Sequence, residues 1–311
     1  MRAFHSDHFV LPLPQGHRFP MGKYGAIRER VIADLPGVQV TEAPAADDRQ
    51  LALAHSPDYI DRVVRGQLSA AEQRAIGFPW SPPMVERSRR SAGATIAACR
   101  AALRDGVAVN LAGGTHHAYR DRGQGYCVFN DAAIAVRVLQ SESLAAAGRR
   151  SRVAIVDLDV HQGNGTAAIF AGDPSVFTLS LHGATNFPFR KEASDLDVAL
   201  PDGTRDDAYL AALDAALDQV RARFAPELLI YLAGADAHES DRLGKLSLST
   251  AGMVMRDERV FGFAYALDLP VAVAMAGGYG RDMATTVEVH VNTVKAAFVH
   301  WQRRAAQRVA A

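Results

Sequence analysis

The sequence predicts a single α/β domain in which helices cover both faces of a parallel β-sheet. From residue 84 onward, five nearly continuous apolar runs alternate with amphipathic helical segments, a pattern typical of parallel strands that are buried on both faces. The 311-residue chain is 49% hydrophobic and 22% charged, which suits a large folded core. No Pro/Ser-rich or single-charge tract divides the sequence, so we expect one domain over residues 1–311.

Short elements are expected in the first part of the chain, up to about residue 77. Residues 26–35, 56–64 and 69–77 have helical patterns, and residues 38–43 look extended. Ser69 and Glu72 match the capping box that begins a helix. The aromatic, proline-rich segments between these elements include Phe19 and Phe78. We interpret them as ordinary loop packing, with the wall of a pocket as the alternative.

Longer elements follow in regular alternation from residue 84. Apolar runs predict the strands, and helical periodicity predicts the segments between them. The first long helix is expected to end at Gly106. The expected helices are 84–106, 131–147, 166–171, 206–224, 249–267 and a closing segment. The expected strands are 107–114, 152–160, 175–182, 227–236 and 270–279.

The charge and cysteine content exclude several classes of protein. Thirty-four basic residues balance thirty-four acidic ones, so no overall field attracts nucleic acid or an anionic membrane. The cluster Arg87, Arg89 and Arg90 is interpreted as solvated charge at a helix end. The two cysteines, Cys99 and Cys127, exclude a disulfide scaffold and fit a reducing compartment. Since the sequence has neither a signal segment nor an apolar span of about 20 residues, we expect a cytoplasmic protein.

Polar residues follow the end of each expected central strand. The carboxyl ends of parallel strands meet at one edge of the sheet, where ligands bind in open α/β folds. A chance scatter of such residues would not favour one edge, so we expect them to form one site. They are Thr115, His116 and His117; Asp157, Asp159 and His161; Ser180 and His182; Asp236; and Gly277, Gly278 and Tyr279.

Residues 152–166 contain the centre of this expected site. Asp157, Asp159 and His161 are two positions apart, so in an extended strand they would share one face. Three ionisable groups buried on one face would need a compensating cation. Asp159, His161 and Asp236 supply the three protein ligands of a catalytic zinc site. This fairly hard ligand set leaves Fe²⁺, Co²⁺ and Mn²⁺ open as alternatives.

The remaining polar residues are suited to the hydrolysis of an amide. His116 and His117 are candidates for proton transfer, because imidazole titrates near neutral pH. Asp157 is a candidate for orienting one of them. Tyr279 follows two glycines at a strand end, where its phenol could donate a hydrogen bond to a developing oxyanion.

Four blocks in this order resemble the signature of the histone deacetylase superfamily of metal-dependent acyl-lysine hydrolases. The blocks are AGGTHHAYRDRGQGYCVFNDAAIA, VDLDVHQGNGT, LAGADAHESDRLG and AGGYG. The resemblance extends from about His17 to His290 and implies the arginase-deacetylase α/β fold. Gln162, in place of a second histidine, is similar to the class IV branch and its bacterial relatives.

The resemblance implies a role for each candidate residue. Asp159, His161 and Asp236 match the zinc ligands, His117 the general base and Tyr279 the residue that stabilises the oxyanion. His116 matches the companion histidine, paired with Asp157. The family also implies a structural potassium ion, held by Asp157, Asp159, His161, Ser180 and Leu181, and a substrate tunnel lined by Gly125, Tyr126, Phe187, Gly278 and Leu243.

Two residues depart from the class I pattern. Asn164 stands where many members have an aspartate beside the base histidine, so we expect a lower His117 pKa than an aspartate would give. Tyr126 stands where phenylalanine is usual and adds a hydroxyl to the tunnel wall.

The sequence leaves several functions and partners open. The expected substrate is an acyl-lysine protein or peptide, with an acetylated polyamine or another acylated small amine as the alternative. An arginase-like ureohydrolase would need more carboxylates, and a non-catalytic acyl-ligand sensor would be expected to lack a ligand, the base or the tyrosine. The acyl group, the native metal and the oligomeric state, a monomer included, are not determined.

Overall fold

The computed structural model describes residues 1–310 and contains one eight-stranded sheet. Its strand order is β2-β1-β3-β8-β7-β4-β5-β6, and every neighbouring pair is parallel. This confirms the predicted α/β class. The strands are β1 (Arg2–His5), β2 (Gln39–Glu42), β3 (Val107–Asn110), β4 (Val153–Asp157), β5 (Val176–Gly183), β6 (Leu196–Leu200), β7 (Leu228–Leu232) and β8 (Val271–Ala274).

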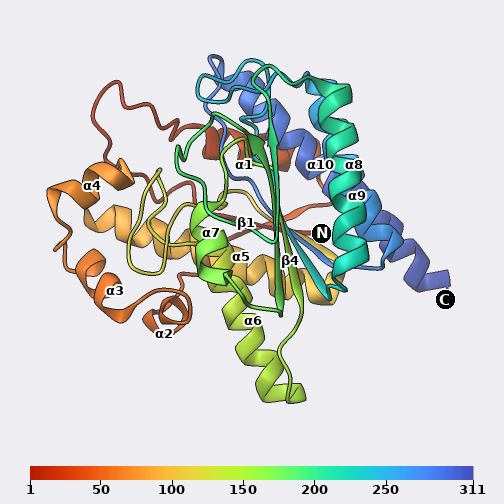
Figure 1. Cartoon of the computed structure of the whole chain (residues 1–311), viewed down its shortest axis with the longest axis horizontal. Helices are drawn as coiled ribbons and strands as arrows, with labels where there is room; N and C mark the ends of the chain where they lie inside the picture. The colour runs from red at the N-terminus through yellow and green to blue at the C-terminus, as the bar shows by residue number, and fades with distance from the viewer. Residues whose placement is uncertain (311) are drawn as a thin grey trace.

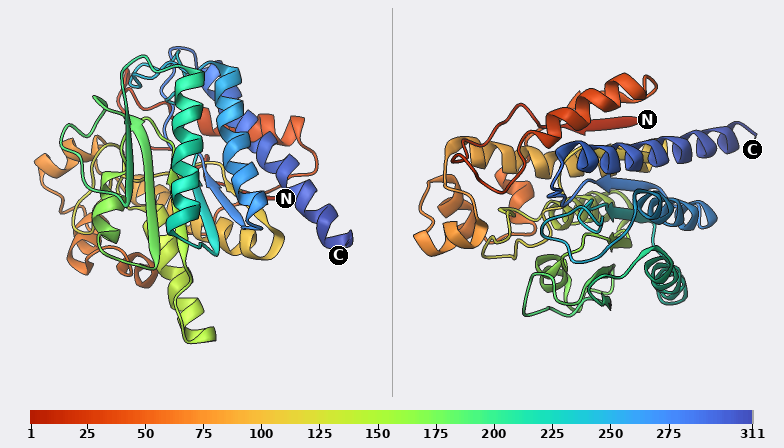
Figure 2. Two further views of the ribbon diagram at one scale, coloured as in Figure 1. Left: turned by 45° about the vertical axis from the view of Figure 1, so that its right-hand side comes forward. Right: turned by 90° about the horizontal axis from the view of Figure 1, so that it is seen from above.

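Helices cover both faces of this sheet, as Figure 1 shows. On one face α5 (Pro82–Asp105) and α6 (Asp131–Ala147) pack together. The other face is covered by α1 (Lys23–Asp34), α8 (Asp206–Arg223), α9 (Thr250–Ala266) and α10 (Met283–Ala310). The right-hand view of Figure 2 shows α1 beside α10. The short helices are α2 (Asp48–Ala52), α3 (Pro57–Val64), α4 (Ala70–Ile76) and α7 (Asn164–Phe170).

The pleat of the strands divides the core into two clusters. In β3, Val107 and Val109 pack in the cluster under α8, α9 and α10, whereas Ala108 packs in the cluster under α5 and α6. Successive side chains of a strand point to opposite faces, so a strand buried on both faces is apolar throughout. This arrangement explains why the central strands were visible in the sequence as continuous apolar runs.

Side-chain caps set the helix boundaries. Ser69 accepts from the Glu72 amide and Glu72 bonds back to Ser69, so the predicted capping box is present at α4. Asn130 caps α6, which ends at Gly148 in the left-handed conformation. Gly106 ends α5 as predicted. Within the described residues, no helix combines the length and the apolar character needed to cross a membrane.

Three sequence interpretations need correction. The strands expected over 107–114, 152–160, 227–236 and 270–279 end earlier, at Asn110, Asp157, Leu232 and Ala274, and neither β1 nor the edge strand β6 was predicted. β6 is short and alternates between partly buried and exposed positions, so it lacks a continuous apolar run. Arg87 is not a solvated helix end: it is buried within α5, where its guanidinium lies 4.5 Å from the Tyr24 ring and donates to the Ser6 carbonyl.

Two mid-helix glycines provide a test of the packing around α5. A Cβ on Gly93 would lie 1.9 Å from the Pro44 carbonyl oxygen, whereas nothing lies within 4 Å of a Cβ on the exposed Gly262 of α9. We expect Gly93→Ala to destabilise the fold by about 2 kcal/mol through overpacking. Gly262→Ala should stabilise it by about 0.5–1 kcal/mol. Chemical unfolding of both variants checks this, and shifts of the same sign would contradict the packing described.

Candidate active site

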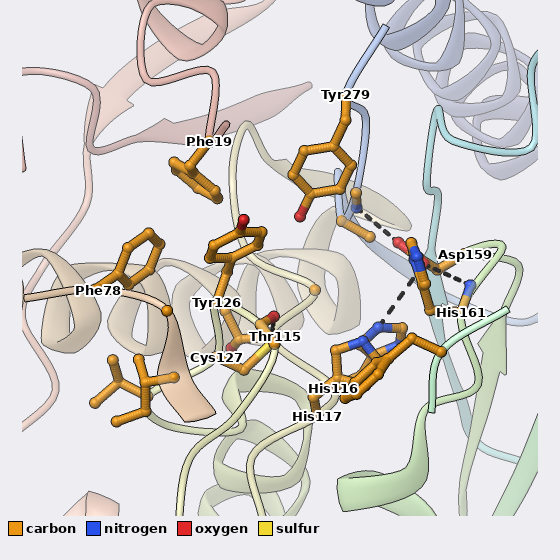
Figure 3. Close-up of a pocket in the computed structure, with 18 of the residues that line it drawn as sticks. Phe19, Phe78, Thr115, His116, His117, Tyr126, Cys127, Asp159, His161 and Tyr279 are labelled. Carbon is orange, nitrogen blue, oxygen red and sulfur yellow. Dashed lines mark hydrogen bonds and ion pairs between the residues drawn. The ribbon is translucent and has the colours of Figure 1, made fainter. Parts of the chain in front are cut away.

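A cavity of about 530 Å³ opens at the carboxyl edge of the sheet. The strand registers bring the ends of the central strands together, since Asn110 pairs with Ala274 and Asp157 pairs with both Leu232 and Ser180. In Figure 3, Phe19, Phe78 and Tyr126 lie on one side of the cavity, opposite the histidines, and the Tyr279 hydroxyl points into the space between. Phe19 and Phe78 therefore form part of a pocket wall, which corrects the preferred interpretation of ordinary loop packing in favour of its alternative.

Asp159, His161 and Asp236 form a buried cluster beside this cavity. Each residue offers one ligand atom, and these atoms lie within 4.8 Å of one another. The first two come from the turn after β4, where the Asp159 amide donates to Asp157 (3.1 Å) and the His161 amide donates to Asp159 (2.9 Å). The D-x-D-x-H motif is therefore arranged by these turns and not by an extended strand.

The cluster fits a divalent cation. His161 Nδ1 faces both carboxylates, 2.9 Å from Asp159 Oδ1 and 3.3 Å from Asp236 Oδ2. Among the described residues, Asp236 Oδ2 is buried without a hydrogen bond. A Cβ on Gly277 would lie 1.9 Å from that oxygen, so only glycine leaves this space open. Two carboxylates and one imidazole supply the three protein ligands that a catalytic zinc site takes, from ligand types that bind zinc.

The electrostatics of the metal-free cluster support this interpretation. Burial lowers the pKa of His161, but its hydrogen bond to Asp159 and its ion pairs with Asp159 and Asp236 outweigh burial and raise the pKa to about 10. Burial and the Asp159 charge raise the pKa of Asp236 to about 7. Without a metal, a proton on His161 therefore occupies the position where the carboxylates require positive charge.

A second cluster, formed by His5, Asp7 and His8, also has metal-ligand spacing. Here Asp7 already has a counter-charge, because Arg28 Nε lies 2.9 Å from Asp7 Oδ2 and His5 Nδ1 lies 2.6 Å from Asp7 Oδ1. This cluster is complete as an ion-pair network and does not require a cation.

The two adjacent histidines have different partners. His116 Nδ1 lies 2.6 Å from Asp157 Oδ2, and His117 Nδ1 lies 2.8 Å from Asn164 Oδ1. Burial lowers the pKa of His116, but the charges of Asp157 and Asp159 outweigh it and raise the pKa to about 9. Burial, followed by the charges of His116 and His161, holds the pKa of His117 well below its usual value. At neutral pH, His116 is therefore cationic and His117 is neutral.

Tyr279 is held through its backbone by residues that the sequence did not single out. Its amide donates to Asp241 Oδ2 (2.6 Å), and its carbonyl accepts from Arg242 Nε (2.9 Å). The buried Lys23 donates to the carbonyls of Ala276 and Gly278, both at 3.3 Å. These contacts reach backbone atoms from distant segments, so spacing alone could not reveal them. Burial raises the pKa of Tyr279, which keeps the phenol protonated as a donor.

All the expected tunnel residues except Gly278 lie at the cavity. Gly125, Tyr126, Phe187 and Leu243 line the cavity. A Cβ on Gly125 would lie 2.6 Å from the His117 ring, so a side chain there would displace the histidine. Gly278 does not line the cavity and instead offers its carbonyl to Lys23 behind Tyr279.

Comparisons with known proteins place this site in a family context. Residues 17–294 match the family model described as histone deacetylase domain. The chain is 32% identical to histone deacetylase 2 of Arabidopsis thaliana, over 87% of this chain and 72% of that protein. It is 33% identical to the acetoin utilization protein AcuC of Bacillus subtilis, over 65% of this chain and 56% of that protein.

A solved structure shares the fold. The crystal structure of an HDAC homolog from Aquifex aeolicus superposes with a TM-score of 0.80 at 23% identity and covers 96% of this chain and 84% of that one. At this level of identity, the similarity supports the fold alone.

The carboxylate cluster predicts a stability effect of zinc. A ligand that binds only the folded state stabilises it, by about 2.7 kcal/mol when its free concentration is 100 times Kd. We therefore expect zinc to raise the Tm of chelator-treated wild-type protein. Asp236→Asn should abolish that increase because it removes a charged ligand.

Glu239→Gln is the matched control, since Glu239 is an exposed acid in the same loop. This variant should respond to zinc as wild type does. An equal zinc response in Asp236→Asn would contradict the assignment of the cluster.

Proposed function

Since this chain belongs to the histone deacetylase family, we propose that it hydrolyses the amide bond of Nε-acyl-lysine with the help of a zinc ion. The family is one of deacetylases and amidohydrolases. The observation that supports the proposal most directly is the convergence of the Asp159–His161–Asp236 cluster, His117 and Tyr279 at one cavity.

Each residue of the site has a distinct part in the proposed reaction. Zinc bound by the cluster would act as a Lewis acid and lower the pKa of a water molecule. The neutral His117 accepts the proton of the attacking water and delivers it to the leaving lysine amine. Tyr279 donates its hydroxyl hydrogen to the oxyanion. His116, paired with Asp157, lies beside His117 and helps to form the wall of the site.

A potassium ion next to this site is part of the proposal. Its proposed ligands Asp157 and Ser180 are register partners in β4 and β5, and Leu181 follows in the same strand. Asp159 and His161 connect this position to the zinc cluster. The role of potassium would be structural.

The cavity is suited to acyl groups larger than acetyl. Its volume of about 530 Å³ lies in the range of pockets for drug-sized ligands. Leu11, Phe19 and Ala112 give its wall an apolar surface. Longer acyl chains are therefore candidate substrates beside acetyl.

The charges of the cavity favour acyl-lysine over an acetylated polyamine. Among the described residues that line it, Asp159 is the only carboxylate, and the proposed zinc would neutralise it. Arg74, Arg87 and Lys245 line the same cavity. A polyamine carries several positive charges and would find no free counter-charge here.

A panel of substrates tests the proposed function. We expect hydrolysis of acyl-lysine peptides, compared from acetyl through lactyl and crotonyl to myristoyl, with lower kcat/KM for acetylpolyamines. Chelation should abolish activity and zinc should restore it. A preference for acetylpolyamines would favour the small-amine alternative. No turnover of any substrate would indicate a non-catalytic acyl-ligand sensor.

A pair of Tyr→Phe variants tests the role of Tyr279. Loss of one oxyanion donor typically costs about 3 kcal/mol, which corresponds to roughly 100-fold in kcat. We expect Tyr279→Phe to show this loss in steady-state kinetics. Tyr126→Phe removes another hydroxyl from the same cavity and should change kcat far less. Full turnover in Tyr279→Phe would refute the proposed role.

A further inference from the structure

His117 is the first member of a series of hydrogen bonds that ends at a carboxylate outside the cavity. His117 Nδ1 lies 2.8 Å from Asn164 Oδ1, and Asn164 Nδ2 donates to the Tyr119 hydroxyl at 3.0 Å. The Tyr119 hydroxyl in turn donates to Glu192 Oε1 at 3.0 Å. We call His117, Asn164, Tyr119 and Glu192 the Tyr119 network.

An asparagine alone cannot determine how it pairs with a histidine. Its amide can accept through oxygen or donate through nitrogen, and the two orientations have nearly the same shape. If Asn164 donated to His117, the ring would need its proton on Nε2, and that nitrogen could no longer accept a proton from water. An ionised aspartate would not have this ambiguity, because it only accepts hydrogen bonds.

The far end of the Tyr119 network removes the ambiguity. The Tyr119 hydroxyl donates its one hydrogen to the Glu192 carboxylate, which offers only acceptor oxygens there. The Tyr119 oxygen is then free to accept from Asn164 Nδ2, which turns Asn164 Oδ1 toward His117. His117 Nδ1 must therefore carry the proton, and Nε2 retains the lone pair that a general base requires.

We propose that Tyr119 and Glu192 are positioning residues that fix the tautomer and the ring orientation of His117 through Asn164. The tautomer itself follows from the hydrogen bonds, whereas its importance for catalysis rests on the proposed function. In this arrangement the carboxylate that sets the direction of the hydrogen bonds, Glu192, does not contact the histidine. The side chains of Tyr119 and Asn164 lie between them.

Both outer members of the network are held in place by further contacts. The Glu192 amide donates to Gln162 Oε1 (2.9 Å), and Gln162 Nε2 donates to the Glu192 carbonyl (2.7 Å). The Arg122 guanidinium lies 3.7 Å from the centre of the Tyr119 ring. Neither Tyr119 nor Glu192 lines the cavity, so their loss should affect turnover more than substrate binding.

The test combines kinetics with a direct measurement of the tautomer. Tyr119→Phe breaks the network in the middle, and Glu192→Ala removes its acceptor. We expect each to lower kcat about ten-fold with KM changed less than two-fold, because residues that orient a reactive group typically cost 10–100-fold when replaced. Glu192→Gln can donate as well as accept, so it should recover little of the kcat lost in Glu192→Ala, whereas Glu192→Asp keeps a carboxylate and should recover more. Melting curves exclude misfolded variants.

The ¹⁵N spectrum of His117 in the zinc-loaded protein reports the tautomer without any need for turnover. Its signals are identified by their loss in a His117→Phe variant. Wild type should show a single Nδ1-protonated form, and Tyr119→Phe should show a mixture with the Nε2-protonated form.

Asp121→Asn is the control for a nearby charge, since Asp121 is exposed and pairs with Arg122 but does not belong to the network. It should leave both the kinetics and the spectrum as in wild type. An unchanged tautomer in Tyr119→Phe, or an equal fall in kcat for Asp121→Asn, would overturn the proposal. Absence of turnover in the wild-type protein would refute the proposed function and leave the spectral test decisive for the network.

Discussion

Burial of two carboxylates at the carboxyl edge of the sheet is the constraint on which the rest of the site depends. Asp159 and Asp236 are fully buried, and the His161 ring lies between them. Carboxylates removed from water in this way need either a proton or a metal ion. Gly277 leaves space beside the two carboxylates. Any side chain at this position would clash with both Asp159 and Asp236.

The negative charge of these buried carboxylates also affects the protonation of the neighbouring histidines. His116 lies beside Asp157 and near Asp159, so its charged form is stabilised. His117 faces the neutral amide of Asn164, and burial together with the two neighbouring cations favours its neutral form. Two adjacent residues of the same type thus differ in charge because their partners differ, which is how paired groups come to serve as acid and base.

The sequence predicted those features that depend on local pattern. Central strands buried on both faces are apolar throughout, so β3, β4, β5, β7 and β8 were visible, whereas the short strands β1 and β6 were not. Asp159 and His161 lie together with Asp236, but they do not follow one another along a strand as expected, because β4 ends at Asp157. Their convergence depends on amide-to-carboxylate turns, which side-chain periodicity does not describe.

Residues that act through the backbone or through another side chain could not be predicted in this way. Lys23 holds the carbonyls around Tyr279 from more than 250 positions away, and Glu192 reaches His117 only through two intermediates. The family resemblance placed Gly278 in the tunnel, but the Gly278 carbonyl accepts from Lys23 outside the cavity lining. Such contacts depend on how loops from different strands meet, which only the folded structure reveals.

Anomalous diffraction at the zinc absorption edge, from crystals of the purified protein, tests most directly whether the buried carboxylates bind a metal ion. The account predicts one strong peak about 2.0–2.2 Å from the ligand atoms of Asp159, His161 and Asp236. A map with no peak at this cluster, or with zinc only at His5, Asp7 and His8, would contradict it.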